Sequence, residues 1–133
     1  MSTATRSHLA LIFVAAVGLL ASGCIHHESK VYPPVEANSL ATRLEAARAI
    51  TFMNERDQAL GAVARDAARA GNVSVTRDAL QNMTFVNARD NAAGDCALAL
   101  SEAGSATAAV EVARMITFLN KRDQVLKKLA TGN

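Results

Sequence analysis

Tryptophan is absent from this chain of 133 residues, and aromatic residues make up only 4% of it. Half of the chain is hydrophobic, and alanine is the dominant apolar residue. Because alanine has the highest helix propensity while β-branched and aromatic residues favour strands, this composition predicts a helical protein. It also predicts a core in which each residue contributes little buried apolar area.

Neither sign of charge is in large excess. Arg6 is the only Lys, Arg, Asp or Glu among residues 1–23, so the 14 basic and 12 acidic residues leave residues 24–133 close to neutral. This balance argues against binding to nucleic acid through phosphate neutralisation. We find no Ser-His-Asp set and no phosphate-binding glycine loop, and His26-His27 is better explained as a solvated tail than as a metal site. We therefore expect no enzyme activity, no metal and no cofactor.

Residues 1–23 have the pattern of a targeting sequence. The apolar run from Leu9 to Leu20 is shorter than a membrane-spanning helix needs, and small residues follow it up to Cys24. This ending resembles a bacterial lipobox, which implies cleavage before Cys24 and acylation of its thiol, by palmitate for example, and of its new amino group. Ile25 after the cysteine then implies an outer-membrane lipoprotein facing the periplasm. The alternatives are an ordinary secretory signal or an uncleaved anchor.

The remainder divides into a tether and a repeat domain. Residues 24–37 contain the lipidated cysteine and a polar stretch that ends in an extended Pro33-Pro34 segment. Residues 38–133 contain one motif three times, at equal intervals and without insertions: Ile50–Asp57, Met83–Asp90 and Ile116–Asp123. A fixed period of about 33 residues indicates stacked supersecondary units. The expected units are residues 40–72, 73–105 and 106–133.

Each unit is expected to contain two helices. Around the repeated motif, the apolar stripes before and after it lie on opposed sides of one continuous helix, so a break between them is needed. The repeated asparagine (Asn54, Asn87 and Asn120) is a candidate N-cap, with an aspartate three residues later in the first turn. Gly71 and Gly104 are expected to end the second helices of units 1 and 2, and Asn38 or Ser39 to cap the first helix. The alternative is a bundle of three long helices.

Several residues have expected roles in packing. The repeated phenylalanine (Phe52, Phe85 and Phe118) is expected to be a buried anchor, and Cys96 a small buried hydrophobic residue rather than a reactive thiol. Gly61 and Gly94 suggest that two helices cross closely. Lys127 replaces them in the third unit, which we interpret as a polar terminal cap.

The repeat resembles the tetratricopeptide-like superfamily. The resemblance is carried by the fixed period, by Ala-x-x-Ile in the first helix, by Arg-Asp-x-Ala-Leu from Arg56 to Leu60, and by the ending from Ala68 to Asn72. It covers residues 40–133. It implies an all-α fold, a short α-solenoid of three antiparallel helix hairpins, with the first helix of each hairpin lining a concave binding face.

Two polar rows run along the expected first helices. Their members are Glu45, Asp78 and Glu111, followed three residues later by Arg48, Gln81 and Arg114. They are either a ladder for a partner segment or a solvated face braced by i,i+3 pairs. A second recurrent group, Arg56, Arg89 and Arg122, is placed to reach the first helix of the next unit.

We therefore expect a lipid-anchored module of the cell envelope that binds a protein partner, as yet unidentified, on its repeat surface. The alternative is a structural envelope lipoprotein that associates with itself and has no dedicated ligand.

Overall fold

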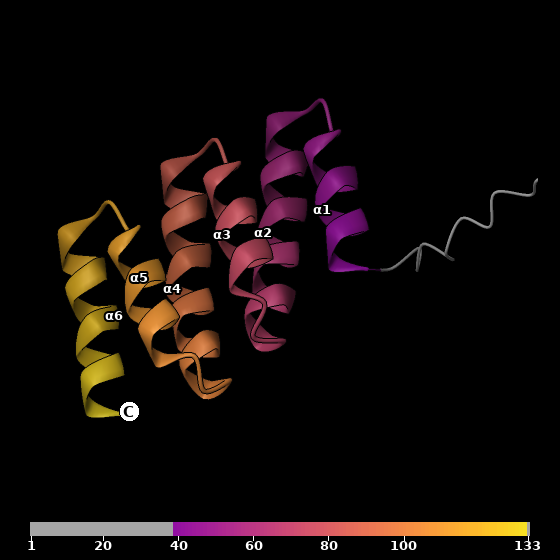
Figure 1. Cartoon of the computed structure of the whole chain (residues 1–133). Helices are drawn as coiled ribbons and strands as arrows, with labels where there is room; N and C mark the ends of the chain where they lie inside the picture. The colour runs from indigo at the N-terminus through magenta and orange to yellow at the C-terminus, as the bar shows by residue number, and fades with distance from the viewer. Residues whose placement is uncertain (1–38, 133) are drawn as a thin grey trace, which may run out of the picture. The chain divides into compact units, whose positions relative to one another are not determined.

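The computed structural model describes residues 39–132, and these residues form six α-helices and no strand (Figure 1). Short and long helices alternate: α1 (Leu40–Arg48), α2 (Met53–Arg69), α3 (Val73–Gln81), α4 (Val86–Glu102), α5 (Ala106–Arg114) and α6 (Leu119–Thr131). The described part of the chain is therefore all-α, as predicted. The alternative of three long helices is wrong, because each unit contains two helices with a short connection between them. The expected targeting segment, Cys24 and the tether lie outside the described residues.

The six helices follow one another in a row from α1 to α6 (Figure 1). Helix α2 packs against α1, α3 and α4, and α4 packs against α2, α3, α5 and α6. The connections α1–α2, α3–α4 and α5–α6 lie along one edge of the row, the upper edge in Figure 1, and the other two connections lie along the opposite edge. We call the edge that carries the connections α1–α2, α3–α4 and α5–α6 the upper edge.

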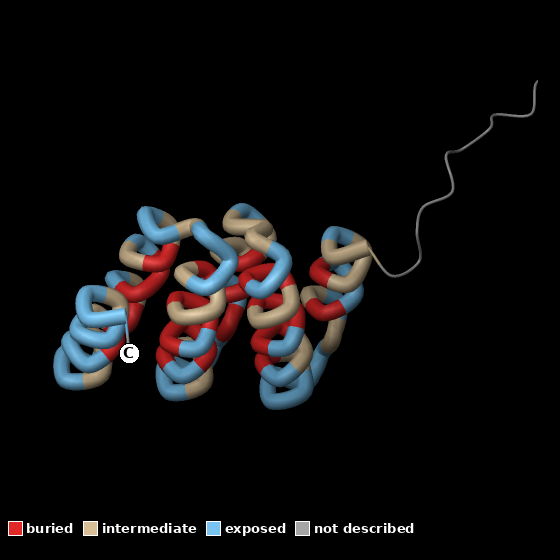
Figure 2. The backbone as a smooth tube through the Cα atoms, turned by 90° about the horizontal axis from the view of Figure 1, so that it is seen from below, coloured by how far each residue is buried: buried red, intermediate tan, exposed pale blue. Residues whose placement is uncertain are grey.

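Buried residues line the inner sides of the helices (Figure 2). The largest fully buried apolar side chains are Leu60, Leu80, Leu100, Ile116 and Val112. Most of the other buried hydrophobic residues are alanines. The core is thus made of a few branched aliphatic residues surrounded by small ones, as the composition predicts.

The predicted helix ends are confirmed. Gly71 has φ of 69° and Gly104 has φ of 80°, the left-handed conformation that glycine adopts without strain. At the first of these ends, the Asn72 N–H donates to the Ala67 carbonyl at 2.8 Å and the Gly71 N–H to the Ala68 carbonyl at 3.0 Å. This pair of bonds is a Schellman motif, which satisfies carbonyls that the helix leaves free.

Caps of two kinds begin the short helices α1 and α3. Ser39 caps α1, with its hydroxyl accepting from the Thr42 N–H at 3.2 Å, whereas Asn38, the other candidate, lies outside the described residues. Asn72 caps α3 by accepting from the Val75 N–H at 3.1 Å. Asn72 thus takes part in the C-terminal cap of α2 and also caps the N-terminus of α3.

The predicted starts of the long helices are wrong. Helices α2, α4 and α6 begin before the repeated asparagine, and their N-caps are Phe52, Phe85 and Phe118, without a side-chain cap. Asn54 therefore lies inside the first turn of α2. The aspartate expected to complete that cap acts elsewhere: Asp57 and Asp90 accept from the N–H groups of the two residues just before α4 and α6. The phenylalanines instead adopt the extended dihedral angles at which the long helices begin.

The phenylalanines are not buried anchors either. Phe52 is 74% exposed, Phe85 41% and Phe118 51%. Each has extended backbone dihedral angles at the helix start. The aliphatic side chains of the helices fill the core in their place. A truncation of Phe85 therefore removes less buried area than the sequence suggests.

Two further expectations have opposite outcomes. Cys96 is fully buried, as predicted. Gly61 and Gly94 do not mark a close approach of two backbones. A Cβ added at Gly61 would lie 3.5 Å from Arg65 Nη1 and 3.6 Å from Met83 Cε, which is ordinary contact with flexible side-chain ends.

Candidate interaction surfaces

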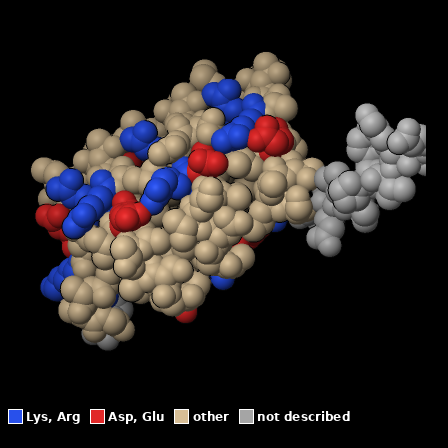
Figure 3. Space-filling model, viewed as in Figure 1, with Lys and Arg blue, Asp and Glu red and all other residues tan. Residues whose placement is uncertain are grey.

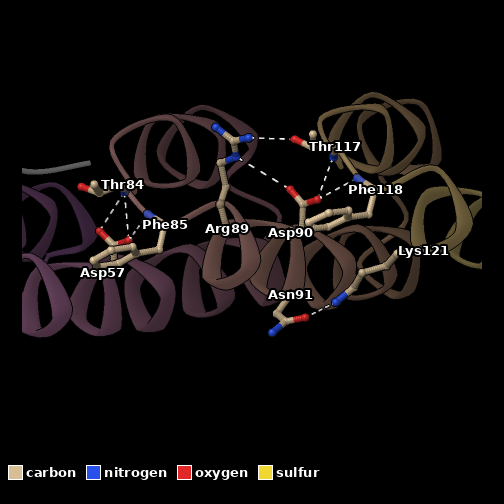
Figure 4. Close-up of polar contacts among 9 residues, drawn as sticks. All are labelled: Asp57, Thr84, Phe85, Arg89, Asp90, Asn91, Thr117, Phe118 and Lys121. Atoms are coloured by element: carbon tan, nitrogen blue, oxygen red, sulfur yellow. Dashed lines mark hydrogen bonds and ion pairs between the residues drawn. The ribbon is translucent and has the colours of Figure 1, made fainter.

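Asp57 connects the first unit to the second. It lies on α2, is 2% exposed, and its carboxylate receives two backbone N–H groups from the connection between α3 and α4 (Figure 4). The Thr84 N–H lies 2.9 Å from both carboxylate oxygens, and the Phe85 N–H lies 2.7 Å from Oδ2. These are charge-assisted hydrogen bonds at the start of a helix, where a negative charge is favourable.

Asp90 repeats this arrangement between the second and third units. Its Oδ2 accepts from the Thr117 N–H at 2.8 Å and from the Phe118 N–H at 3.0 Å, and the residue is fully buried (Figure 4). We call each such arrangement, an aspartate with the two N–H groups that it binds, an inter-unit clamp. The aspartate expected to act within its own unit therefore acts on the next one.

The neighbouring arginines bind the same connection through a hydroxyl. Arg56 Nη2 donates to Thr84 Oγ1 at 2.7 Å, and Arg89 Nη2 donates to Thr117 Oγ1 at 2.9 Å. The expectation that these arginines reach the next unit is confirmed, but their partner lies after the first helix and not on it. Arg89 Nε also lies 3.8 Å from Asp90 Oδ1. Arg89 and Asp90 therefore both bind the connection between α5 and α6.

The third copy of the pair has no such partner among residues 39–132. The Asp123 side chain is 72% exposed, and its Oδ1 lies 3.8 Å from Nε of the adjacent Arg122. The outer side of α6 thus carries the acceptor half of an inter-unit clamp.

The six residues of the predicted polar rows do not form one constellation. Glu45 and Arg48 form the expected i,i+3 pair, with Oε1 and Nη1 2.6 Å apart. Glu111 pairs instead with Arg77 of the preceding unit. Arg114 is exposed on α5. On the face seen in Figure 3, basic and acidic side chains alternate in a band that runs across the helices.

Two members of the rows come together near the upper edge. Arg48 and Gln81 line a depression of about 320 Å³ with Arg56 and Asn82. Asp78 lies one turn before Gln81 on α3 and is half-buried. The depression is polar, and it adjoins the connections that carry the phenylalanines.

The upper edge also carries a row of exposed apolar residues, a feature that was not predicted from the sequence. Its exposed large hydrophobic residues are Phe52, Met53, Phe85, Val86, Phe118 and Leu119. They occur as one adjacent pair per unit, at the period of the repeat. Exposed apolar residues that gather in one patch are a common feature of interaction sites. The period of the apolar pair is visible in the sequence, but its exposure is not, because the exposure depends on where the long helices begin.

A larger groove lies between the first two units. It has a volume of about 520 Å³ and is lined by residues of α2, by residues of α4, and by Met83 and Phe85 before α4. Arg65 lies within it, with Nη1 3.8 Å from Asp95 Oδ2 on α4. The groove thus follows the seam that the first inter-unit clamp holds.

Two titratable groups are perturbed. The side-chain hydrogen bond from Arg43 lowers the pKa of Asp66, which accepts from Arg43 Nη2 at 2.6 Å. Burial raises the pKa of the Cys96 thiol to about 12. A buried thiol that stays protonated is a poor nucleophile, as expected for this residue.

Comparisons with protein-family models, with curated proteins and with solved structures found no match to this chain. Over residues 39–132, no group of three or more His, Cys, Asp or Glu side chains is placed to hold a metal ion. None of the described helices combines the length and the apolar character needed to cross a membrane.

Proposed function

We propose that this chain is a protein-interaction module of the bacterial cell envelope, and that its partner binds along the upper edge. The fold that we propose for it is a short α-solenoid of three antiparallel hairpins of the tetratricopeptide-like kind. The alternation of short and long helices at the fixed period of the repeated motif supports this fold. So does the packing of α2 and α4 against neighbours on both sides.

The observation that carries the function is the apolar row on the upper edge. Phe52 and Phe118 are more than half exposed in an otherwise alanine-rich domain, and each lies beside another exposed apolar residue. Aromatic side chains contribute much of the energy of protein interfaces. Arg48, Gln81 and Arg114 end the short helices at this edge and supply a polar rim.

The polar rim gives the predicted rows a narrower role. In this proposal Arg48, Gln81 and Arg114 contact the partner, because they are the last residues of α1, α3 and α5 and so reach the upper edge. Glu45, Asp78 and Glu111 lie one turn further away. Glu45 and Glu111 already have basic partners within the chain.

Membrane attachment through Cys24 is the second part of the proposal. The apolar run followed by Ala21-Ser22-Gly23-Cys24 supports a lipid anchor, with the repeat domain facing the periplasm at the outer membrane. Cells producing the wild type and Cys24→Ser are fractionated and labelled with a fatty acid. We expect the wild type to carry the label and to sediment with membranes, and Cys24→Ser to do neither. Membrane association of Cys24→Ser without labelling of the wild type would refute the anchor.

Cross-linking in membranes tests the partner surface. We compare the wild type with a Phe52→Ser, Phe118→Ser double variant, and use an Ala70→Ser, Ala103→Ser double variant as the control on the opposite edge. All four positions are exposed, so the variants should keep the fold. We expect a distinct cross-linked species that only the phenylalanine variant loses. Equal loss in both variants, or retention in both, would contradict binding at the upper edge.

The second candidate function is a structural lipoprotein that associates with itself. The Arg122-Asp123 pair, in which Asp123 is exposed, favours it, because the equivalent Arg-Asp pairs make inter-unit contacts elsewhere in the chain.

A further inference from the structure

The inter-unit clamp occurs twice inside the chain, and one half of it remains at each end of the described domain. At the α6 end, Asp123 is 72% exposed and accepts no hydrogen bond within residues 39–132, whereas Asp90 is fully buried. At the α1 end, the positions equivalent to Thr117 and Phe118 are Thr51 and Phe52. Within the described residues, neither of their N–H groups donates a hydrogen bond.

Exposure of the phenylalanines follows the same pattern. Phe85 and Phe118 have a unit before them and are 41% and 51% exposed. Phe52 has no such unit within the described residues and is 74% exposed. The α1 end therefore presents the surface that units 2 and 3 turn toward their predecessors.

The two end faces also carry opposite charges at matching positions. Inside the chain, a Cβ on Gly94 of α4 would lie 3.5 Å from Val125 Cγ2 and 3.6 Å from Lys121 Cε of α6. The residue equivalent to Gly94 on the outer side of α6 is Lys127. The residue equivalent to Lys121 at the α1 end is Glu55, which is exposed. If the first unit of another copy followed α6 at the same period, the carboxylate of its Glu55 would lie beside Lys127.

We propose that copies of this chain stack head to tail, with α6 of one copy packed on α1 and α2 of the next. Asp123 then accepts from the Thr51 and Phe52 N–H groups of the next copy, and Arg122 donates to the Thr51 hydroxyl. Lys127 pairs with Glu55 of that copy and so takes part in the contact, instead of ending the array as a polar cap. The contact joins two different faces, so its repetition builds a ring or an open filament and not a twofold dimer.

This inference rests on the second candidate function, self-association, and gives it a geometry. It shares Phe52 with the partner surface but uses the backbone N–H of that residue, and its other contacts lie on the end faces.

Disulfide trapping between full-length chains tests the geometry. Lys127→Cys and Ala59→Cys are placed on chains with different tags, because these positions repeat the contact of Gly94 with Val125, in which a Cβ on Gly94 would lie 3.5 Å from Val125 Cγ2. Both chains are produced in one bacterial host and oxidised. We expect a heterodimer with both tags, and neither variant cross-linked to itself beyond the background that Cys24 and Cys96 give in wild-type pairs. Self-cross-linking of Lys127→Cys would instead show a symmetric contact and overturn the proposal.

A variant of the clamp then tests its chemistry. Adding Asp123→Ala to the Lys127→Cys chain should lower the heterodimer yield roughly tenfold, as expected for losing charge-assisted hydrogen bonds. The matched control is Lys128→Ala. Lys128 is equivalent to Asp95, which contacts Arg65 of the preceding unit, so it should face the second unit of its own chain and not the next copy. This control should leave the yield unchanged. An unchanged yield with Asp123→Ala would overturn the proposal.

Charge reversal separates a specific contact from a folding defect. In co-precipitation of two tagged full-length chains, we expect Lys127→Glu and Glu55→Lys each to reduce recovery and the two together to restore it. Co-precipitation of wild-type chains without the heterodimer would overturn the head-to-tail geometry and leave self-association standing. No co-precipitation at all would overturn both, and would leave the proposed partner surface untouched.

Discussion

Replacing Asp90 by alanine tests whether the inter-unit clamp holds the fold together. The substitution removes the acceptor of two backbone N–H groups, those of Thr117 and Phe118. Each buried donor left without a partner costs about 1–3 kcal/mol. Thr117 and Phe118 are themselves exposed, so water can reach part of the turn. We therefore expect the free energy of unfolding to fall by about 2–4 kcal/mol, a large share of the ~5–15 kcal/mol typical of a domain.

The chain supplies its own matched controls. Asp123→Ala deletes the same side chain at the equivalent position of the third unit, where it accepts no hydrogen bond from residues 39–132, and should leave unfolding unchanged in dilute solution. Asn87→Ala should also have little effect, because Asn87 is exposed and is not the N-cap of α4. Asp90→Asn keeps one acceptor and should fall between the wild type and Asp90→Ala.

Urea melts followed by circular dichroism, on a chain beginning at Ile25, measure these differences. If Asp123→Ala lowers the midpoint as much as Asp90→Ala does, the aspartate acts within its own helix and the inter-unit clamp does not stabilise the fold. A loss on Asn87→Ala equal to that on Asp90→Ala would lead to the same conclusion.

Three further outcomes are expected. Gly61→Ala should raise the free energy of unfolding by up to ~1 kcal/mol, because alanine favours the helix and its Cβ meets only side-chain ends at 3.5 Å or more; urea melts would show the opposite sign if the added methyl group clashed. In a Cys24→Ser background, Cys96 should react with a thiol reagent only as fast as the domain unfolds, because the thiol is buried. Burial also raises the pKa of the Cys96 thiol to about 12, so the free energy of unfolding should be highest below pH 9 and decline toward pH 12. The Arg43 hydrogen bond lowers the pKa of Asp66, so its contribution is present above pH 4 and is lost as the pH falls further; Asp66→Asn should flatten the acid side of a stability profile.

Local chemistry made part of this fold predictable from the sequence. Gly71 and Gly104 end helices because the left-handed conformation is a property of the residue itself. Ser39 caps α1 for the same kind of reason, through a bond that spans three residues. The fixed period of the repeated motif and the dominance of alanine likewise predicted paired helices.

The starts of the long helices were not predictable in this way. Asn54 followed by Asp57 has the pattern of a local cap, but Asp57 acts on Thr84, 27 residues away. Nothing in the sequence of a single unit distinguishes an aspartate that binds its own turn from one that binds the next. Phe85 is predicted to be buried for a different reason, because phenylalanine is the largest of the repeated apolar residues. The candidate site was missed for this reason, since its apolar residues had been assigned to packing.

The short reach of the inter-unit clamps has a consequence for how the chain folds. Each carboxylate precedes the amides that it binds by 27 or 28 residues, so these contacts join only neighbouring units. The loop that each contact closes therefore has the same length along the chain, and its entropic cost does not grow from one unit to the next. During synthesis the acceptor is also made before its donors, and a completed α2 holds a carboxylate ready for the turn that emerges next. We expect order to spread from the N-terminal unit toward the C-terminal one, each helix preparing the start of its successor.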